Sequence, residues 1–223
     1  SRRVKERGIV FHTDAVQTVG KIPIDLSRTG VDMLSLSGHK FGGPQGTGAL
    51  WVRRGVTLTA QQTGGRQERG RRAGTENVPA LAGMGAAAAD VRQALASTSA
   101  RIGALRDRLE CEIVAAVPRS HINGTTASRV PNTSNLSFEH VEGESLAIAL
   151  DLEGIAVSTG SACSSGTPEP SHVLRAMGLP ASRVQGAVRF SLGPGTTEAE
   201  IEQVVAILPR IVARLRQLGG VRR

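Results

Sequence analysis

The feature that most constrains the fold is a pair of short apolar runs, each of which ends in polar residues and a turn. The first covers residues 8–12 (GIVFH) and the second covers residues 31–37 (VDMLSLS). Runs of this length, rich in large apolar residues and bounded by turns, predict buried β-strands. A third strand is predicted over residues 49–53, after a glycine-rich segment. The sequence therefore predicts an α/β protein in which strands alternate with helices.

The predicted helices change in composition near residue 100. Residues 77–100 are rich in alanine, the strongest helix former, whereas residues 101–117 carry an apolar stripe. We expect two helices here, the second ended by Pro118. Thr197 and Glu200 form a capping-box pattern that predicts the start of the last helix. The remaining predicted elements are strands at 134–138, 155–157 and 187–192 and helices at 144–152 and 171–177.

Composition excludes several classes of protein. The chain has 223 residues, of which 39% are hydrophobic and 21% charged, as in an ordinary soluble α/β protein. No apolar run is long enough to cross a bilayer, so we expect no membrane association. The net charge of +8 raises the question of nucleic acid. Against this, the chain has no tyrosine and one tryptophan, which leaves few rings to stack on bases, and we expect no nucleic-acid partner.

The change near residue 100 also predicts a domain boundary, which gives domains at residues 1–95 and 96–223. The chain opens with SRRVKERG, polar residues that look like the last turn of a helix, directly before a buried strand. Only three strands are predicted before residue 77, fewer than a parallel sheet needs to cover its edges. We therefore expect this chain to be the second half of a longer protein.

Two charged side chains are predicted at one edge of the first sheet. Asp14 follows the first strand and Lys40 follows the second, and open α/β sheets bind ligands at the carboxyl ends of their strands. Ser37 and His39 stand beside Lys40. Taken singly, Asp14 would cap a helix and Lys40 would face solvent. Together, a carboxylate, an amine, a hydroxyl and an imidazole suit a cofactor with a pyridine ring, an aldehyde and a phosphate.

The glycines that follow Lys40 let the backbone approach a ligand closely. A nucleotide-binding P-loop would also be glycine-rich, but its lysine follows the glycines, whereas Lys40 precedes them. The motif therefore favours the aldehyde cofactor over a nucleotide.

The two cysteines differ in their surroundings, which favours a reducing compartment over a disulfide, and we expect a cytoplasmic protein. Cys163 lies in STGSACSSGTPEPS, a polar, glycine-rich segment that predicts an exposed loop and a reactive thiol. Cys111 lies opposite the apolar stripe of its helix and is interpreted as structural. Arg189, taken alone on its predicted strand, is interpreted as a salt-bridge partner.

Six motifs follow one another along the chain: DAVQTVGKIPIDL, SLSGHKFGGPQGTGAL, RAGTENVP, VEGESL, STGSACSSG and VRFSLG. With these motifs in this order, the chain resembles the pyridoxal-phosphate (PLP) cysteine desulfurases of the NifS/IscS type from about Gly8 to Leu215. This family belongs to the class V aminotransferases and to PLP fold type I, the aspartate-aminotransferase-like architecture. The resemblance implies that residues 1–95 are the C-terminal part of the PLP-binding large domain. Residues 96–223 would be the small C-terminal domain that carries the catalytic-cysteine loop.

The resemblance also implies a role for each site residue. Lys40 and Cys163 would be catalytic: Lys40 would bind the cofactor covalently and move protons, and Cys163 would accept sulfur as a persulfide. Arg189 would bind the α-carboxylate of the substrate, and no metal is expected. The implied PLP contacts, besides Lys40, are Asp14 at the ring nitrogen, Gln17 at the phenolic oxygen, Ser37 and His39 at the phosphate, and Thr75 at the phosphate of the partner subunit's cofactor.

The implied activity converts L-cysteine into L-alanine and passes the sulfur to acceptors, for iron–sulfur cluster assembly or tRNA thiolation. The implied partners are a second copy of the chain in a homodimer and an acceptor such as an iron–sulfur scaffold protein. The glycine-rich loop and the ring-stacking histidine of the family's N-terminal half have no counterpart here, so a separate N-terminal half is a further expected partner. Two alternatives stay open: a selenocysteine lyase-type PLP enzyme, and an inactive truncated half that acts as a binding or assembly module.

Overall fold

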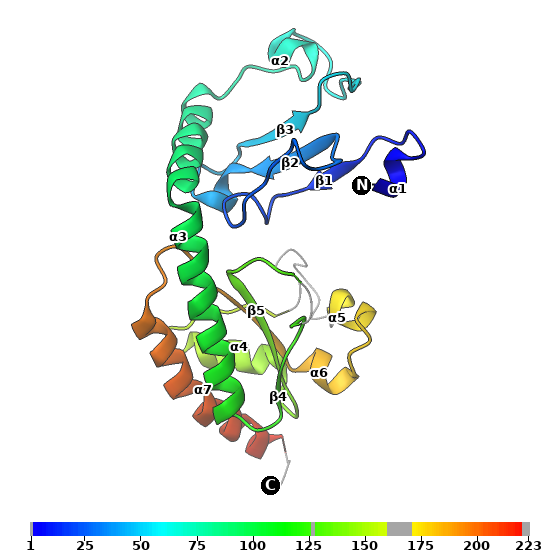
Figure 1. Ribbon diagram of the computed structural model, residues 1–223. Coiled ribbons are helices and arrows are strands. Elements are labelled where there is room, and N and C mark those ends of the chain that lie inside the picture. The colour runs from blue at the N-terminus through cyan, green and yellow to red at the C-terminus, as the bar shows by residue number, and fades with distance from the viewer. Residues whose placement is uncertain (1, 126–127, 160–170, 220–223) are drawn as a thin grey trace. The chain divides into compact units, whose positions relative to one another are not determined.

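The computed structural model describes residues 2–125, 128–159 and 171–219 (Figure 1). It confirms the predicted α/β class. The chain divides into two compact units, Ser1–Ser97 and Thr98–Arg223, and the division falls inside helix α3 (Val78–Ala116). None of the helices formed by the described residues combines the length and the apolar character that crossing a membrane requires.

The first unit contains a three-stranded mixed sheet. Its strands β1 (His12–Asp14), β2 (Met33–Ser37) and β3 (Gly48–Val52) lie in that order. β1 and β2 run parallel, whereas β2 and β3 run antiparallel. A small apolar core packs against the sheet and consists of Ala15, Val31 and Leu34, with Phe11, Val19, Leu26, Leu36 and Trp51 around them. The unit also contains three short helices, α1 (Arg2–Lys5), the 3₁₀ helix η1 (Gly38–Phe41) and α2 (Gln67–Gly70), and the first part of α3.

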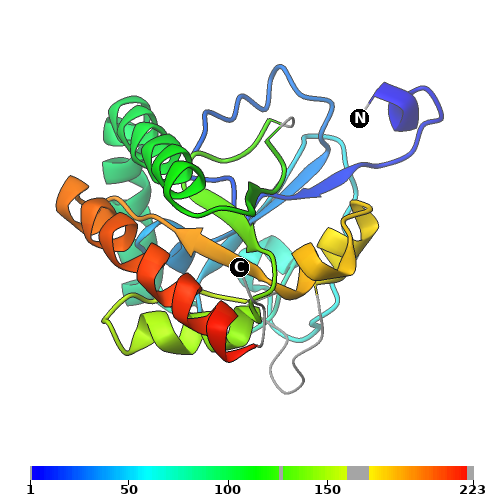
Figure 2. The ribbon, with the colours of Figure 1, turned by 90° about the horizontal axis from the view of Figure 1, so that it is seen from below.

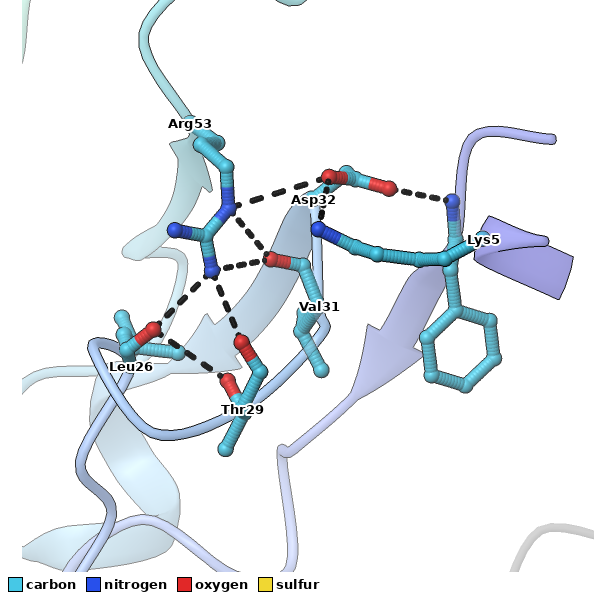
Figure 3. A network of polar contacts seen from close by, with 7 residues as sticks. Lys5, Leu26, Thr29, Val31, Asp32 and Arg53 are labelled. Carbon is cyan, nitrogen blue, oxygen red and sulfur yellow. Dashed lines mark hydrogen bonds and ion pairs between the residues drawn. The ribbon is translucent and has the colours of Figure 1, made fainter. Parts of the chain in front are cut away.

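A polar network holds the beginnings of β1 and β2 together (Figure 3). The carboxylate of Asp32, just before β2, accepts a hydrogen bond from the backbone N–H of Phe11 at 3.0 Å. The same carboxylate pairs with Lys5 at 3.5 Å and with Arg53 at 3.7 Å. The pKa of Asp32 is lowered, first by the hydrogen bond from Phe11 and then by the two cations. The parallel pairing of the strands is therefore fixed from its amino end.

Arg53, directly after β3, ties the loop before β2 to the sheet. Its guanidinium lies 5.2 Å from the centroid of the Trp51 ring, within the range of a cation–π contact. It also donates, over distances of 2.8 to 3.0 Å, to the backbone carbonyls of Leu26, Thr29 and Val31 (Figure 3). A lysine would not replace it, because only the planar fork of arginine reaches several carbonyls at once.

The second unit contains a three-stranded antiparallel sheet. Its strands β4 (Ser120–Ile122), β5 (Thr133–Phe138) and β6 (Ala187–Ser191) lie in that order. Its helices are the end of α3, then α4 (Gly143–Asp151), α5 (His172–Ala176), α6 (Ala181–Gln185) and α7 (Glu198–Leu218). Helices α3, α4 and α7 lie on one side of the sheet (Figure 2).

The two faces of the second sheet differ in polarity because side chains alternate along each strand. On β5, Leu136 and Phe138 are fully buried in the core that α3, α4 and α7 form with the sheet. Asn135 and Ser137 belong to the opposite face. On β6, Val188 and Phe190 enter the same core, which leaves Arg189 on the face of Asn135.

The structure corrects several predicted elements. The two helices expected over 77–117 are one continuous helix, α3, of 39 residues. β1 begins at His12, not at Gly8, because Gly8 has φ of +65° and Ile9 and Val10 are half exposed. The strand expected at 155–157 is absent from the described residues there, and only a single bridge joins Ser158 to Arg189. β4 and α6 were not predicted.

Candidate functional site

Asp14 is the last residue of β1, at the carboxyl end of the parallel pair. The strand register places it opposite Ser35, and the next residue continues the ladder because the N–H of Ala15 donates to the carbonyl of Ser35 at 2.9 Å. The Oδ1 atom of Asp14 accepts from the N–H of Val16 at 2.8 Å, and a turn follows in place of the helix that the alternative interpretation assumed. Oδ2 has no hydrogen-bond partner among the described residues. The exposed carboxylate is thus fixed by one oxygen and open at the other.

Ser37, His39 and Lys40 follow at the end of β2. Helix η1 begins immediately after Ser37, so it carries His39 and Lys40 beyond the edge of the sheet, where both are exposed. The hydroxyl of Ser37 lies 2.9 Å from Nδ1 of His39. Gly42 ends η1 with φ of +92°, a conformation that favours glycine. The short helix therefore presents an amine next to a paired hydroxyl and imidazole.

The loop after Lys40 is closed by a buried contact. The hydroxyl of Thr47, which is buried, donates to the carbonyl of Pro44 at 2.8 Å, and the N–H of Gly38 donates to the carbonyl of Thr47 at 2.9 Å. A Cβ atom on Gly38 would lie 2.6 Å from the hydroxyl of Thr47. The glycine at position 38 is therefore required for the close packing that holds Lys40 in place.

Lys21 belongs to this group and was not predicted from the sequence. Its Nζ atom donates to the carbonyl and the side-chain oxygen of Gln17 at 3.0 and 3.3 Å. The pKa of Lys21 is lowered, first by burial and then by the positive charge of Lys40. Lys21 thus lies close to both Gln17 and Lys40. The one signal in the sequence is its spacing of four residues from Gln17, the spacing of neighbours on a helical turn.

Thr75 lies in the segment between α2 and α3, where it is exposed. That segment is held by the N–H of Gly74, which donates to Gln67 at 3.2 Å, and by the N–H of Ala73, which donates to the carbonyl of Gln62 at 3.1 Å. No hydrogen bond joins Thr75 to Asp14 or Lys40 among the described residues.

Arg189 belongs to the second unit, on β6. It pairs with Asn135 of β5 on one side and, through backbone hydrogen bonds of 2.7 and 3.1 Å, with Ser158 on the other. Its Nε atom is buried and has no hydrogen-bond partner among the described residues. An arginine donor in this state is suited to an incoming anion. Cys163, the second catalytic candidate besides Lys40, lies outside the described residues, and Cys111 is exposed on α3.

The side chains at the end of β1 and β2 fit a PLP cofactor. Asp14 offers a free carboxylate oxygen, Lys40 offers an exposed amine, and Ser37 and His39 offer a hydroxyl and an imidazole. These are the groups that a protonated ring nitrogen, an aldehyde and a phosphate require. The fit rests on all four side chains occurring at the ends of two adjacent parallel strands.

Comparison with known proteins supplies the family. The model of the class-V aminotransferase family matches residues 1–204. The chain belongs to the class-V aminotransferases. Enzymes of this family depend on PLP, which agrees with the side chains at the end of β1 and β2.

The relatives are cysteine desulfurases. The chain is 52% identical over 218 residues to the cysteine desulfurase of Trichormus azollae, covering 98% of this chain and 54% of the relative. It is 50% identical over 219 residues to the cysteine desulfurase NifS of Azotobacter vinelandii, covering 98% of this chain and 54% of the relative. The chain thus spans about half the length of the curated relatives it matches, and the resemblance to the NifS-type enzymes is confirmed.

Solved structures agree. A NifS-like protein superposes with a TM-score of 0.86 at 36% sequence identity, covering 96% of this chain and 56% of the other. The X-ray structure of a NifS-like protein from Rickettsia africae ESF-5 gives a TM-score of 0.86 at 32% identity, covering 95% of this chain and 56% of the other. The predicted PLP fold type I is therefore confirmed, whereas the assignment of residues 1–95 and 96–223 to its two domains stays a prediction.

Proposed function

We propose that the protein is a PLP-dependent cysteine desulfurase, which converts L-cysteine into L-alanine and leaves the sulfur as a persulfide for transfer to an acceptor. One observation carries the proposal: the parallel pairing of β1 and β2 brings Asp14 and the Ser37–Lys40 segment to one sheet edge. Relatives at 50 to 52% identity that are named cysteine desulfurases support it.

The bound cofactor would supply an aldehyde that takes up the amino group of the substrate and a ring that withdraws electrons from it. The free oxygen of Asp14 would keep a proton on the ring nitrogen, because a carboxylate next to a cation stabilises the charged form. The Nζ atom of Lys40 would bind the aldehyde and then hold and return a proton. Gln17, whose side chain Lys21 orients, would donate to the phenolic oxygen.

The remaining roles concern the phosphate of the cofactor, the carboxylate of the substrate and the sulfur. Ser37 and His39, already paired at 2.9 Å, would donate together to the phosphate. Arg189 would bind the substrate carboxylate through its fork of N–H donors, of which Nε is without a partner among the described residues. Cys163 would attack the substrate sulfur as a thiolate, since a thiol is a far weaker nucleophile.

For partners, we propose a homodimer in which Thr75 reaches the phosphate of the neighbouring subunit's cofactor. The exposure of Thr75, which leaves its hydroxyl accessible to a neighbouring subunit, supports this role. A sulfur-acceptor protein such as an iron–sulfur scaffold is the proposed recipient. We also propose a cytoplasmic location, because two cysteines in unrelated contexts suit a reducing compartment.

The test is turnover of L-cysteine by the PLP-loaded protein, reconstituted with any separate N-terminal half, in the presence of a reductant. We expect sulfide and L-alanine to appear in equal amounts, and we expect Lys40→Ala to form neither. Arg54→Ala, which removes an exposed cation after β3, is the control for charge and should keep the activity. Failure of the unaltered PLP-loaded protein to form alanine would contradict the proposal.

A further inference from the structure

A row of polar side chains crosses the face of the second sheet opposite its apolar core, at the level of Arg189. Asn135 is the register partner of Arg189 on β5. On the far side of Asn135, the N–H of Asn123 donates to the carbonyl of Asn135 at 2.8 Å, so Asn123 extends the row beyond β4. Ser158 is the bridge partner of Arg189 on its other side. Directly paired residues project to the same face, so the row runs Asn123, Asn135, Arg189, Ser158.

Arg183, on α6, fixes the direction of the hydrogen bonds at one end of this row. Its Nη2 atom donates to Oδ1 of Asn123 at 2.5 Å. A guanidinium has donors and no acceptor, so the oxygen of the Asn123 amide must face Arg183. The Nδ2 atom of Asn123 then donates to Oδ1 of Asn135 at 2.6 Å and to the hydroxyl of Ser137 at 2.7 Å. Asn123 is buried and every polar atom of its side chain is used.

The orientation of Asn135 follows from this chain of contacts. Because its oxygen is held by Asn123, its N–H₂ group lies on the side away from Asn123. The described residues give Nδ2 of Asn135 no hydrogen-bond partner. The neighbour on that side of the row is Arg189, whose Nε is buried and also without a partner among the described residues. Two sets of N–H donors therefore lie side by side, and neither is satisfied by the residues that the structure describes.

We propose that Arg183 is a positioning residue that, through Asn123, orients the amide of Asn135 so that Asn135 and Arg189 together bind the α-carboxylate of the amino-acid substrate. The inference rests on the proposed function, because it takes Arg189 to receive that carboxylate. A carboxylate only accepts hydrogen bonds. If the Asn135 amide were reversed, its oxygen would face the carboxylate oxygens and weaken binding.

The experiment measures ligand binding by isothermal titration calorimetry of the PLP-loaded protein. The two probes are L-alanine, which has the carboxylate, and L-alaninamide, which lacks it. We expect Arg183→Met to weaken L-alanine binding about tenfold, as for loss of a hydrogen bond to a charged group, with L-alaninamide binding unchanged. Arg183→Lys keeps a donor and should restore most of the affinity. Arg214→Met, which removes an exposed arginine of α7, is the control for net charge.

A double-mutant cycle separates the relay from a direct effect of charge. In an Asn135→Ala background there is no amide to orient, so adding Arg183→Met should not weaken the binding of L-alanine any further. An equal loss in both backgrounds, an equal loss for both probes, or no loss at all would overturn the inference. If Arg183→Met does not fold, Asn135→Asp tests the same inference. The new carboxylate at position 135 should repel the carboxylate of L-alanine, so it should weaken L-alanine binding far more than L-alaninamide binding.

The proposed function has its own, separate readout. Its failure appears as absence of alanine and sulfide from L-cysteine, whereas the calorimetric titration requires no turnover. Absence of measurable L-alanine binding to the unaltered protein would overturn the inference by itself.

Discussion

The backbone N–H of Phe11 donates to the carboxylate of Asp32, so the residue that leads into β1 is held by the residue that leads into β2. Asp32→Asn keeps an acceptor for Phe11 but loses the ion pairs with Lys5 and Arg53. We expect a lower melting temperature at neutral pH, measured by circular dichroism.

The same contact predicts a pH dependence. The pKa of Asp32 is lowered in the folded protein, mainly by the hydrogen bond from Phe11, so the unfolded state binds this proton more tightly. The stabilisation is therefore present above the ordinary aspartate pKa of about 3.9 and is lost as the pH falls through the lower, folded value. The difference in melting temperature between the unaltered protein and Asp32→Asn should shrink in acid. A difference that stayed constant from neutral to acid pH would show that the charge of Asp32 is not responsible.

Lys40 is predicted to hold the cofactor. Lys40→Ala should lack the visible absorbance of covalently bound PLP and should melt at the same temperature as the unaltered protein without cofactor, because the side chain is exposed. Absorbance spectroscopy after removal of free PLP checks this. Lys21→Met is an informative comparison: it should keep the covalent link, since Lys21 contacts Gln17 and has no predicted bond to the aldehyde.

Asp14→Asn should lower the turnover rate by about a hundredfold or more, because a neutral amide cannot keep the ring nitrogen protonated. The fold should persist, since the amide oxygen can still accept the hydrogen bond from Val16. Steady-state kinetics measure the turnover rate, and a thermal melt checks that the fold persists. A variant with activity within a few-fold of the unaltered protein would assign Asp14 a purely local role in the turn.

The two cysteines should behave differently during turnover. Mass spectrometry of peptides after reaction with L-cysteine should find one extra sulfur on the peptide with Cys163 and none on the peptide with Cys111. Cys163→Ser should still bind L-cysteine and release almost no sulfide, since a hydroxyl is a poor nucleophile toward sulfur. Cys111→Ser should be fully active, because Cys111 is exposed on α3. Extra sulfur on Cys111 would reverse the assignment.

Thr197 and Glu200 form a complete capping box at the start of α7, in which Thr197 accepts from the N–H of Glu200 and Glu200 accepts from the N–H of Thr197. Thr197→Ala should cost about 1 kcal/mol of unfolding free energy, measured by urea denaturation. Ser182→Ala, on the exposed side of α6, is the control and should be close to neutral. An equal effect of both substitutions would mean that the cap does not stabilise α7.

The capping box also illustrates which features a sequence alone predicts well. Thr197 and Glu200 satisfy each other locally, and the helix begins as expected. The motif around Lys40 is local in the same way, since Ser37, His39 and Lys40 lie together at the end of β2, and the role of Lys40 stays a prediction. By contrast, Lys21 gives almost no signal, because its contacts with Gln17 and its proximity to Lys40 arise only when the turn after β1 forms.

Errors in the predicted elements have physical causes. The change from alanine-rich to striped sequence near residue 100 suggests a break, yet no glycine or proline interrupts residues 92–102, and α3 continues. Ser97 is accommodated in the helix by donating to the carbonyl of Ala94 at 3.1 Å. β4 has only three residues, and its pairing with β5 comes from tertiary contacts that no local pattern reveals. The relay from Arg183 to Asn135 depends on this strand and could not be predicted without it.

The alternation along β5 has a consequence for selection experiments. Leu136 and Phe138 enter the core, whereas Asn135 belongs to the polar row. The same strand therefore contributes to the core and to the polar row. A slip of one residue would place asparagine in the core and leucine at the binding face. A misregistered variant would thus lose solubility together with the proposed carboxylate binding. In a library of β5 variants, screening for soluble expression should by itself enrich clones that retain an assembled binding row.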